Sequence, residues 1–162
     1  MTTITADFFH HFQLPSNSNS SRNDRERGNS TSPTPLASAL QSALAPELLQ
    51  IAHECDQAGW DGYGAKPISK VTCERVAQFV DLLPTWMETP EVSPEPDGEI
   101  AIEWYRPNGA VFSISIGEFG PVNYAGLFGR DQEVHGVEQF LGEVPSRLVR
   151  LISEFLATQS RF

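Results

Sequence analysis

The chain has 162 residues, of which 40% are hydrophobic, and a formal net charge of −10. This length suits one domain with additional residues outside it, and the hydrophobic share is enough for a core. An acidic chain repels phosphate backbones, which argues against direct nucleic-acid binding. No stretch approaches the roughly 18 apolar residues of a membrane span, and no signal-peptide pattern opens the sequence, so we expect a cytoplasmic protein without a membrane segment.

The negative charge is concentrated in the larger, C-terminal part of the sequence. Residues 1–36 hold three acidic and three basic residues, which sum to zero. The remaining acidic residues number 18 (21 less 3) and the remaining basic residues 8 (11 less 3), so residues 37–162 carry the whole −10. Such a domain would attract a basic protein partner, although solubility alone would also account for the charge.

Residues 1–35 are predicted to form a flexible N-terminal arm. A short aromatic patch at 3–14 contains Phe8, Phe9 and Phe12 at helical spacing. Beyond the patch the arm consists of Ser, Asn, Thr, Arg, Asp, Glu, Gly and Pro, which cannot bury enough apolar surface to offset the entropy of ordering. The patch is either a segment that binds a groove on a partner or a frayed terminus.

Residues 36–162 are predicted to form one α+β domain with the element order α-α-β-β-β-α, in which helices cover an antiparallel three-stranded meander. Pro46 suits the first turn of a helix, so we expect one helix to stop before it and another to cover 47–57. The next helix is predicted to begin at the N-cap Ser69 and to stop at Pro84.

Alternating apolar and polar residues over 99–128 predict the three strands. A two-residue turn in the first hairpin would mix polar and apolar side chains, whereas a three-residue turn at 107–109 puts every large aliphatic side chain on one face. The proline- and acid-rich residues 84–98 are predicted to be a surface connection. After the sheet we expect a short helical piece around Val137 and a longer helix from Pro145.

The sequence contains no pattern typical of a catalytic, metal or cofactor site. Cys55 and Cys73 lie in helical segments and are predicted to be buried free thiols, and no nucleophile elbow is present. His53 and Cys55 are two residues apart on a helix and point to different sides. The Gly-Tyr-Gly at 62–64 lacks the preceding strand and the third glycine of a dinucleotide site. We therefore expect no catalytic residue, no metal and no cofactor.

The most distinctive motif is Gly-Trp-Asp-Gly-Tyr-Gly-Ala-Lys-Pro at 59–67. Its glycines predict a loop with unusual backbone angles, and its aromatic residues bring large apolar areas with one polar group each. In one interpretation Trp60 covers the edge of the core, Asp61 caps the turn through its own side chain and Tyr63 bonds a loop carbonyl. In the other, the loop is a recognition surface.

This loop, followed by Asp97-Gly98-Glu99-Ile100 and Glu103-Trp104, resembles an uncharacterised family of small acidic bacterial proteins that share a GWDGYGAxP loop. The resemblance covers roughly residues 46–155 and transfers no catalytic residue. It implies a bacterial accessory protein, and by analogy a partner or neutraliser of a protein encoded nearby.

These observations predict a protein–protein interaction module of antitoxin, immunity or accessory type that binds a basic protein partner. The alternative is a small-molecule-binding protein or enzyme with a pocket between the 59–67 loop and the sheet, in which Glu103 or Asp61 is the acid. Self-association through a sheet edge is a third hypothesis. The predicted partner-binding residues are Trp60, Asp61 and Tyr63, the acids between Glu88 and Glu103 (Glu95, Asp97 and Glu103 among them), and Phe8, Phe9 and Phe12.

Overall fold

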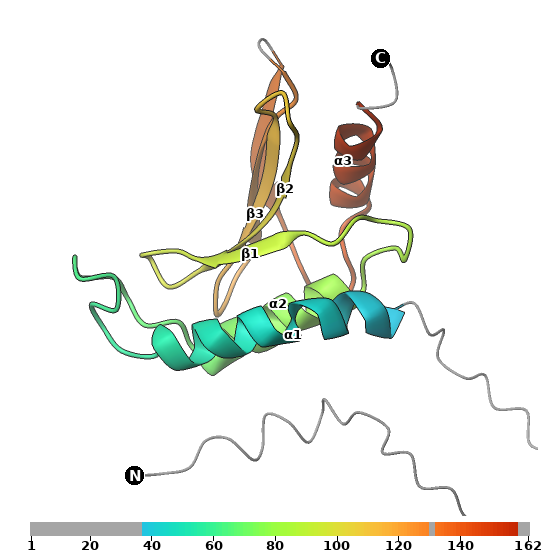
Figure 1. Cartoon of the computed structure of the whole chain (residues 1–162). Coiled ribbons are helices and arrows are strands. Elements are labelled where there is room, and N and C mark those ends of the chain that lie inside the picture. Colours follow the sequence, from blue (N-terminus) through green and yellow to red (C-terminus); the bar gives the residue numbers. More distant parts are fainter. Residues whose placement is uncertain (1–36, 130–131, 159–162) are drawn as a thin grey trace, which may run out of the picture. The chain divides into compact units, whose positions relative to one another are not determined.

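Two helices, five consecutive strands and a final helix follow one another along the chain (Figure 1). The structure, a computed structural model, describes residues 37–129 and 132–158. The elements are α1 (Ala37–Glu54), α2 (Lys70–Asp81), β1 (Glu91–Pro94), β2 (Ile100–Tyr105), β3 (Val111–Ile116), β4 (Val122–Leu127), β5 (Glu133–Glu138) and α3 (Ser146–Ala157). The predicted α+β class is confirmed. The arm, with Phe8, Phe9 and Phe12, lies outside the described residues.

The strands form one antiparallel sheet in the order β1-β2-β3-β4-β5, a meander in which every strand pairs with its neighbour in sequence. The predicted register of the first hairpin is confirmed, because Trp104 lies opposite Phe112 and Ile102 opposite Ile114. Its turn also has the predicted form. Gly109 has a φ of +83°, in the left-handed region that favours glycine, and the Asn108 Oδ1 accepts the Ala110 amide at 3.1 Å.

The predicted three-stranded sheet was wrong in size, because two further strands lie at its edges. β1 falls inside the region predicted to be a surface connection. It ends in Pro94, and an edge strand tolerates proline because one side of its backbone needs no ladder partner. β5 includes Val137, where a helical piece was predicted. Its alternation is weak because Gly136 takes a position facing Tyr124, where a β-carbon would lie 2.5 Å from the tyrosine Oη.

The prediction of a helix break before Pro46 was also wrong, since α1 runs through this residue. Proline in a helix interior removes a hydrogen bond and crowds the preceding turn. Here buried side chains continue along one side of α1 across the proline, at Leu44, Leu48 and Ile51. Their burial stabilises one continuous helix. The predicted starts of the other two helices are confirmed, because Ser69 is the N-cap of α2 and α3 follows Pro145. The predicted ends were too late, since α1 ends at Glu54 rather than at 57 and α2 ends at Asp81, before Pro84 is reached.

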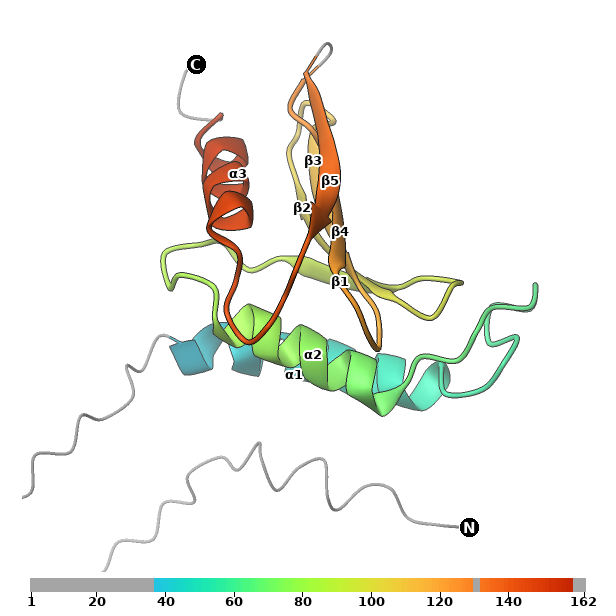
Figure 2. The same ribbon diagram turned by 180° about the vertical axis from the view of Figure 1, so that it is seen from behind.

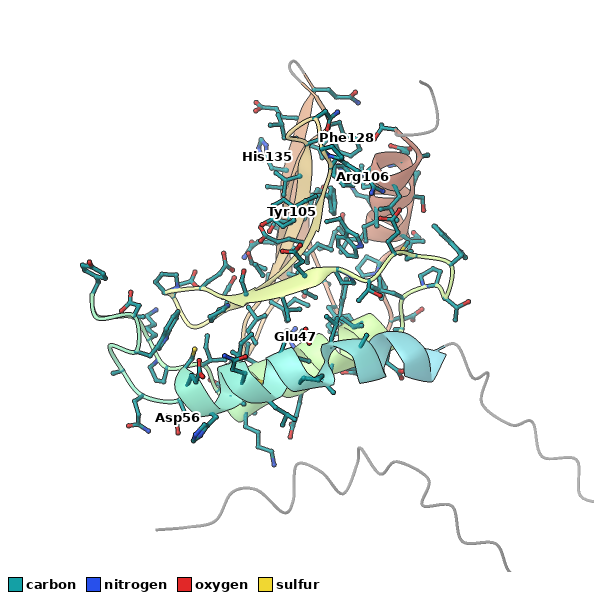
Figure 3. All side chains as sticks on the ribbon, viewed as in Figure 1. Glu47, Asp56, Tyr105, Arg106, Phe128 and His135 are labelled. Carbon is teal, nitrogen blue, oxygen red and sulfur yellow. The ribbon has the colours of Figure 1, made fainter. Side chains whose placement is uncertain are left out.

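One face of the sheet packs against the helices and forms the core with them. Its buried residues include Ile102, Ile114 and Val122, and α3 adds Leu148 and Phe155. Figures 1 and 2 show α3 beside this face, with α1 and α2 side by side at the end of the sheet where β2 begins. We call this the covered face. The opposite side, which carries Tyr105 and His135 (Figure 3), is the open face, and no described helix lies over it.

Phe112 is the centre of the aromatic part of the core. Its ring centroid lies 6.4 Å from that of Trp104, 6.2 Å from Tyr124, 6.1 Å from Phe128 and 6.0 Å from Phe155. Gly126 lies directly opposite Phe112 on β4, and a β-carbon there would lie 2.6 Å from the Phe112 ring. The glycine therefore leaves the space that the phenyl ring occupies.

Candidate partner-binding site

The 59–67 loop follows α1 and is closed by its own hydrogen bonds. The Gly59 amide donates to the Ala65 carbonyl at 2.7 Å, and the indole Nε1 of Trp60 donates to the Lys66 carbonyl at 2.9 Å. Trp60 is half-buried. The indole thus fastens the two ends of the loop together, as one of the two interpretations of the motif predicts.

Asp61 stabilises the interior of the loop through its side chain, as predicted. Its Oδ1 accepts the amide of Tyr63 at 2.8 Å and the amide of Ala65 at 3.0 Å. These two hydrogen bonds, that of Ala65 first, lower the pKa of the Asp61 carboxyl below its ordinary value. Gly62 and Gly64, with φ of +80° and +99°, supply the backbone conformation that the turns require.

The loop leaves Tyr63 in solvent, with 96% of its surface exposed. The predicted hydrogen bond from Tyr63 to a loop carbonyl was wrong, because its hydroxyl makes no hydrogen bond to any residue in the described part of the chain. An aromatic side chain at a rigid loop tip loses little conformational entropy when it binds. Of the three predicted loop residues, Trp60 and Asp61 hold the loop and Tyr63 is available for contact.

The turn between β1 and β2 packs directly against this loop. The Lys66 amide donates to the Pro96 carbonyl at 2.8 Å. Gly98, with a φ of +93°, comes so near that a β-carbon on it would lie 3.3 Å from the Pro67 carbonyl oxygen. The aromatic loop and the acidic turn therefore form one surface, which we call the loop–turn surface and define as residues 59–67 and 95–99.

Three carboxylates of the turn, Glu95, Asp97 and Glu99, converge on the loop–turn surface. One oxygen from each lies within 4.8 Å of the other two. The Asp97 Oδ1 accepts the Glu99 amide at 3.1 Å. The Glu95 Oε2 is buried and has no hydrogen-bond partner in the described structure. This cluster could receive a Lys or Arg side chain, or a hard divalent cation that prefers oxygen ligands.

The surroundings of Glu99 shift the pKa of its carboxyl. Burial raises its pKa above the ordinary 4.5, and the charges of Asp97 and Glu95 add to the effect. Its Oε1 lies against Gly117, where a β-carbon would be 3.0 Å away. The hydrogen bond from Asn123 and the charge of Arg75 offset part of this increase in the pKa of Glu99.

The raised pKa of Glu99 predicts a pH-dependent effect of Glu99→Gln. Because the folded-state pKa lies above the unfolded one, the stabilisation from the protonated acid is complete below pH 4.5 and is lost as pH rises through the folded pKa. At pH 7 we expect the free energy of unfolding of the variant to exceed that of the wild type by less than about 1 kcal/mol. At about pH 4 we expect the two free energies to be equal. Urea unfolding at both pH values measures this difference. The prediction would be contradicted if the stability of the variant relative to the wild type were lower at pH 7 than at pH 4.

Arg75 on α2 is a site residue that the sequence did not reveal. Its Nη1 donates to the Gly117 carbonyl at 2.5 Å and its Nη2 to the Gly120 carbonyl at 2.8 Å. These bonds hold the β3–β4 turn on α2, next to Glu99. They join residues more than 40 positions apart, so no local pattern could indicate them.

Glu103 lies apart from the loop–turn surface, in the middle of β2 on the open face. It is four residues after Glu99, about 13 Å along the strand. The Tyr105 hydroxyl donates to the Glu103 carboxylate, and this hydrogen bond, with burial, raises the pKa of Tyr105 to about 12. The structure brings the end of the loop, at Lys66 and Pro67, against the turn that carries Glu95 and Asp97, whereas Glu103 lies outside this contact.

The two thiols belong to the core, as predicted. Cys55 and Cys73 are buried and free. Burial raises the pKa of Cys73 to about 11 and also raises that of Cys55. Both are therefore protonated at neutral pH and are weak nucleophiles and metal ligands.

Comparison of the chain with protein-family models, curated proteins and solved structures found no match. Within the described residues, no helix has both the length and the apolar character needed to cross a membrane.

Proposed function

We propose that this protein is a protein–protein interaction module of antitoxin, immunity or accessory type, whose acidic domain binds a basic protein partner in the cytoplasm. The observation that carries the proposal is the packing of the aromatic loop on the acidic turn, through the hydrogen bond from Lys66 to Pro96. It connects a loop that carries an exposed tyrosine with a turn that carries three carboxylates, a combination suited to a cationic and partly apolar protein surface.

Charge supports the same proposal. Between Arg75 and Arg106 the sequence contains seven acidic residues and no lysine or arginine. A field of one sign accelerates the encounter with a partner of the opposite sign. The Oε2 of Glu95 lacks a hydrogen-bond partner and the pKa of Glu99 is raised, so a bound cation would stabilise both carboxylates.

The pocket alternative has less support. Asp61 already accepts two backbone amides, and Glu103 accepts the Tyr105 hydroxyl. The two carboxylates therefore do not form a general acid–base pair.

Neutralising the turn is expected to abolish partner recovery. The test variant is E95Q/D97N/E99Q, which removes three charges while the new amide oxygen at position 97 can still accept the backbone N–H of position 99. The matched control is E47Q/D81N/E143Q, which removes the same charges at exposed positions elsewhere. The tagged full-length protein is isolated from its native cell, and co-purifying proteins are quantified by mass spectrometry. We expect a basic partner whose yield falls at least about tenfold in the test variant and less than about twofold in the control.

Added salt and a chelator distinguish binding of a basic partner from the other possible outcomes. Binding between opposite charges weakens as ionic strength rises. Equal recovery with both variants would refute the turn as the binding site, and recovery of no basic partner by the wild type would refute the interaction function. Loss of the partner with EDTA alone would mean that a divalent cation, rather than a partner side chain, occupies the carboxylate cluster.

A further inference from the structure

The open face of the sheet is organised in cross-strand rows of different chemistry. One row contains Tyr105, Val111 and Leu127 and ends in Glu133 on β5. The next row begins with Glu91 and Glu103 and continues through Ser113 and Ala125 to His135, and the third runs from Ala101 through Ser115 and Asn123 to Val137. Figure 3 shows Tyr105 and His135 on this side, away from α3. Three apolar or aromatic side chains are unusually open here: 50% of Tyr105, 40% of Leu127 and 58% of Val137 are exposed.

Two carboxylates on this face repel each other. Glu91 and Glu103 lie directly opposite in the β1–β2 register, an arrangement that destabilises a sheet when both are ionised. Neither forms an ion pair within the described chain, where the paired acids are Glu74, Glu88, Glu138 and Glu154. A cation supplied from outside would relieve the repulsion.

The middle of the face carries small side chains. Ser113, Ser115, Asn123 and Ala125 form a floor of small side chains over β3 and β4, and larger side chains on β2 and β5 flank it. β2 and β5 are three strand spacings apart, about 14 Å. An α-helix with its side chains is about 10–12 Å across, so a helix laid over the floor would fit between the flanking side chains.

We propose that an amphipathic basic helix of the partner protein packs on this open face. Lysine or arginine side chains of the helix lie against Glu91 and Glu103, and its apolar side chains cover Leu127 and Val137. This inference rests on the proposed function and gives the same partner a second contact surface. A second copy of this chain is a poorer occupant, because it brings another net charge of −10 and the same two carboxylates.

Site-specific photocrosslinking tests the inference with the full chain in its native cell. The crosslinking residue p-benzoylphenylalanine replaces Ala125 on the open face, Tyr63 on the loop–turn surface or, as a control position, Glu143; all three are exposed. We expect position 125 to crosslink to a lysine- or arginine-rich segment of the protein that position 63 also captures. We expect position 143 to give no such product.

A second comparison asks whether the acid pair recognises that segment. In the position-125 protein, E91Q/E103Q is expected to lower the crosslink yield at least about fivefold, and the matched control E47Q/E143Q to leave it within about twofold. Circular dichroism checks that each variant is folded. The proposal is overturned by an unchanged yield, by a crosslinked segment without basic residues, or by crosslinking to a second copy. Crosslinks at 63 without any at 125 overturn this inference alone, whereas none at either position overturns the proposed function as well.

Discussion

Phe112→Ala is expected to lower the free energy of unfolding by about 3–5 kcal/mol. The Phe112 side chain is fully buried, and four other aromatic rings surround it, from β2, β4, the end of β4 and α3. Removal of the ring loses its transfer free energy and leaves a cavity, because the rigid neighbouring rings collapse into the space only in part.

Urea unfolding followed by tryptophan fluorescence measures this effect. Phe119→Ala is the matched control, since 77% of Phe119 is exposed and the same substitution there should cost less than about 0.5 kcal/mol. Phe112→Leu keeps part of the volume and provides a milder variant if Phe112→Ala does not fold. Equal effects at positions 112 and 119 would show that Phe112 is not the centre of the core.

The first hairpin could be predicted because its information is local. Alternation along β2 and β3 identifies the buried face, and Pro-Asn-Gly at 107–109 fixes the loop length, so register and turn follow together. The edge strands lack this information. β1 is short and contains Pro94, while β5 carries Gly136 where the covered face needs space for Tyr124. Their strand conformation is determined by the neighbouring strands.

The candidate site also has a part that could be predicted from local sequence and a part that could not. Capping by Asp61 depends on residues two and four positions ahead, and an Asp in a glycine-rich turn predicts it. The contact between the loop and the turn joins Lys66 to Pro96, and the position of both depends on the path of α2 and β1. Sequence patterns therefore identified several of the residues but not the surface that they form.

Glu88 and Arg106 form an ion pair whose two partners are expected to respond unequally to substitution. The Arg106 Nη1 lies 2.8 Å from the Glu88 Oε2, and the Arg106 side chain is 10% exposed against 61% for Glu88. Arg106 also donates to the Leu156 carbonyl at 3.4 Å and lies over the Phe155 ring at 5.6 Å. Figure 3 shows it between the sheet and α3, so the guanidinium connects α3 to the hairpin.

Glu88→Ala should therefore be the more damaging change. It leaves a largely buried guanidinium, whose Nε already lacks a partner, without its carboxylate, and we expect a loss of about 2–3 kcal/mol. Arg106→Met leaves Glu88 in water and keeps an apolar chain against Phe155, so we expect about 1 kcal/mol. The double variant should resemble Arg106→Met and be more stable than Glu88→Ala alone, because no buried charge remains unpaired. Urea unfolding of the three variants gives the coupling free energy, and a larger loss for Arg106→Met than for Glu88→Ala would mean that packing of the arginine chain outweighs its charge.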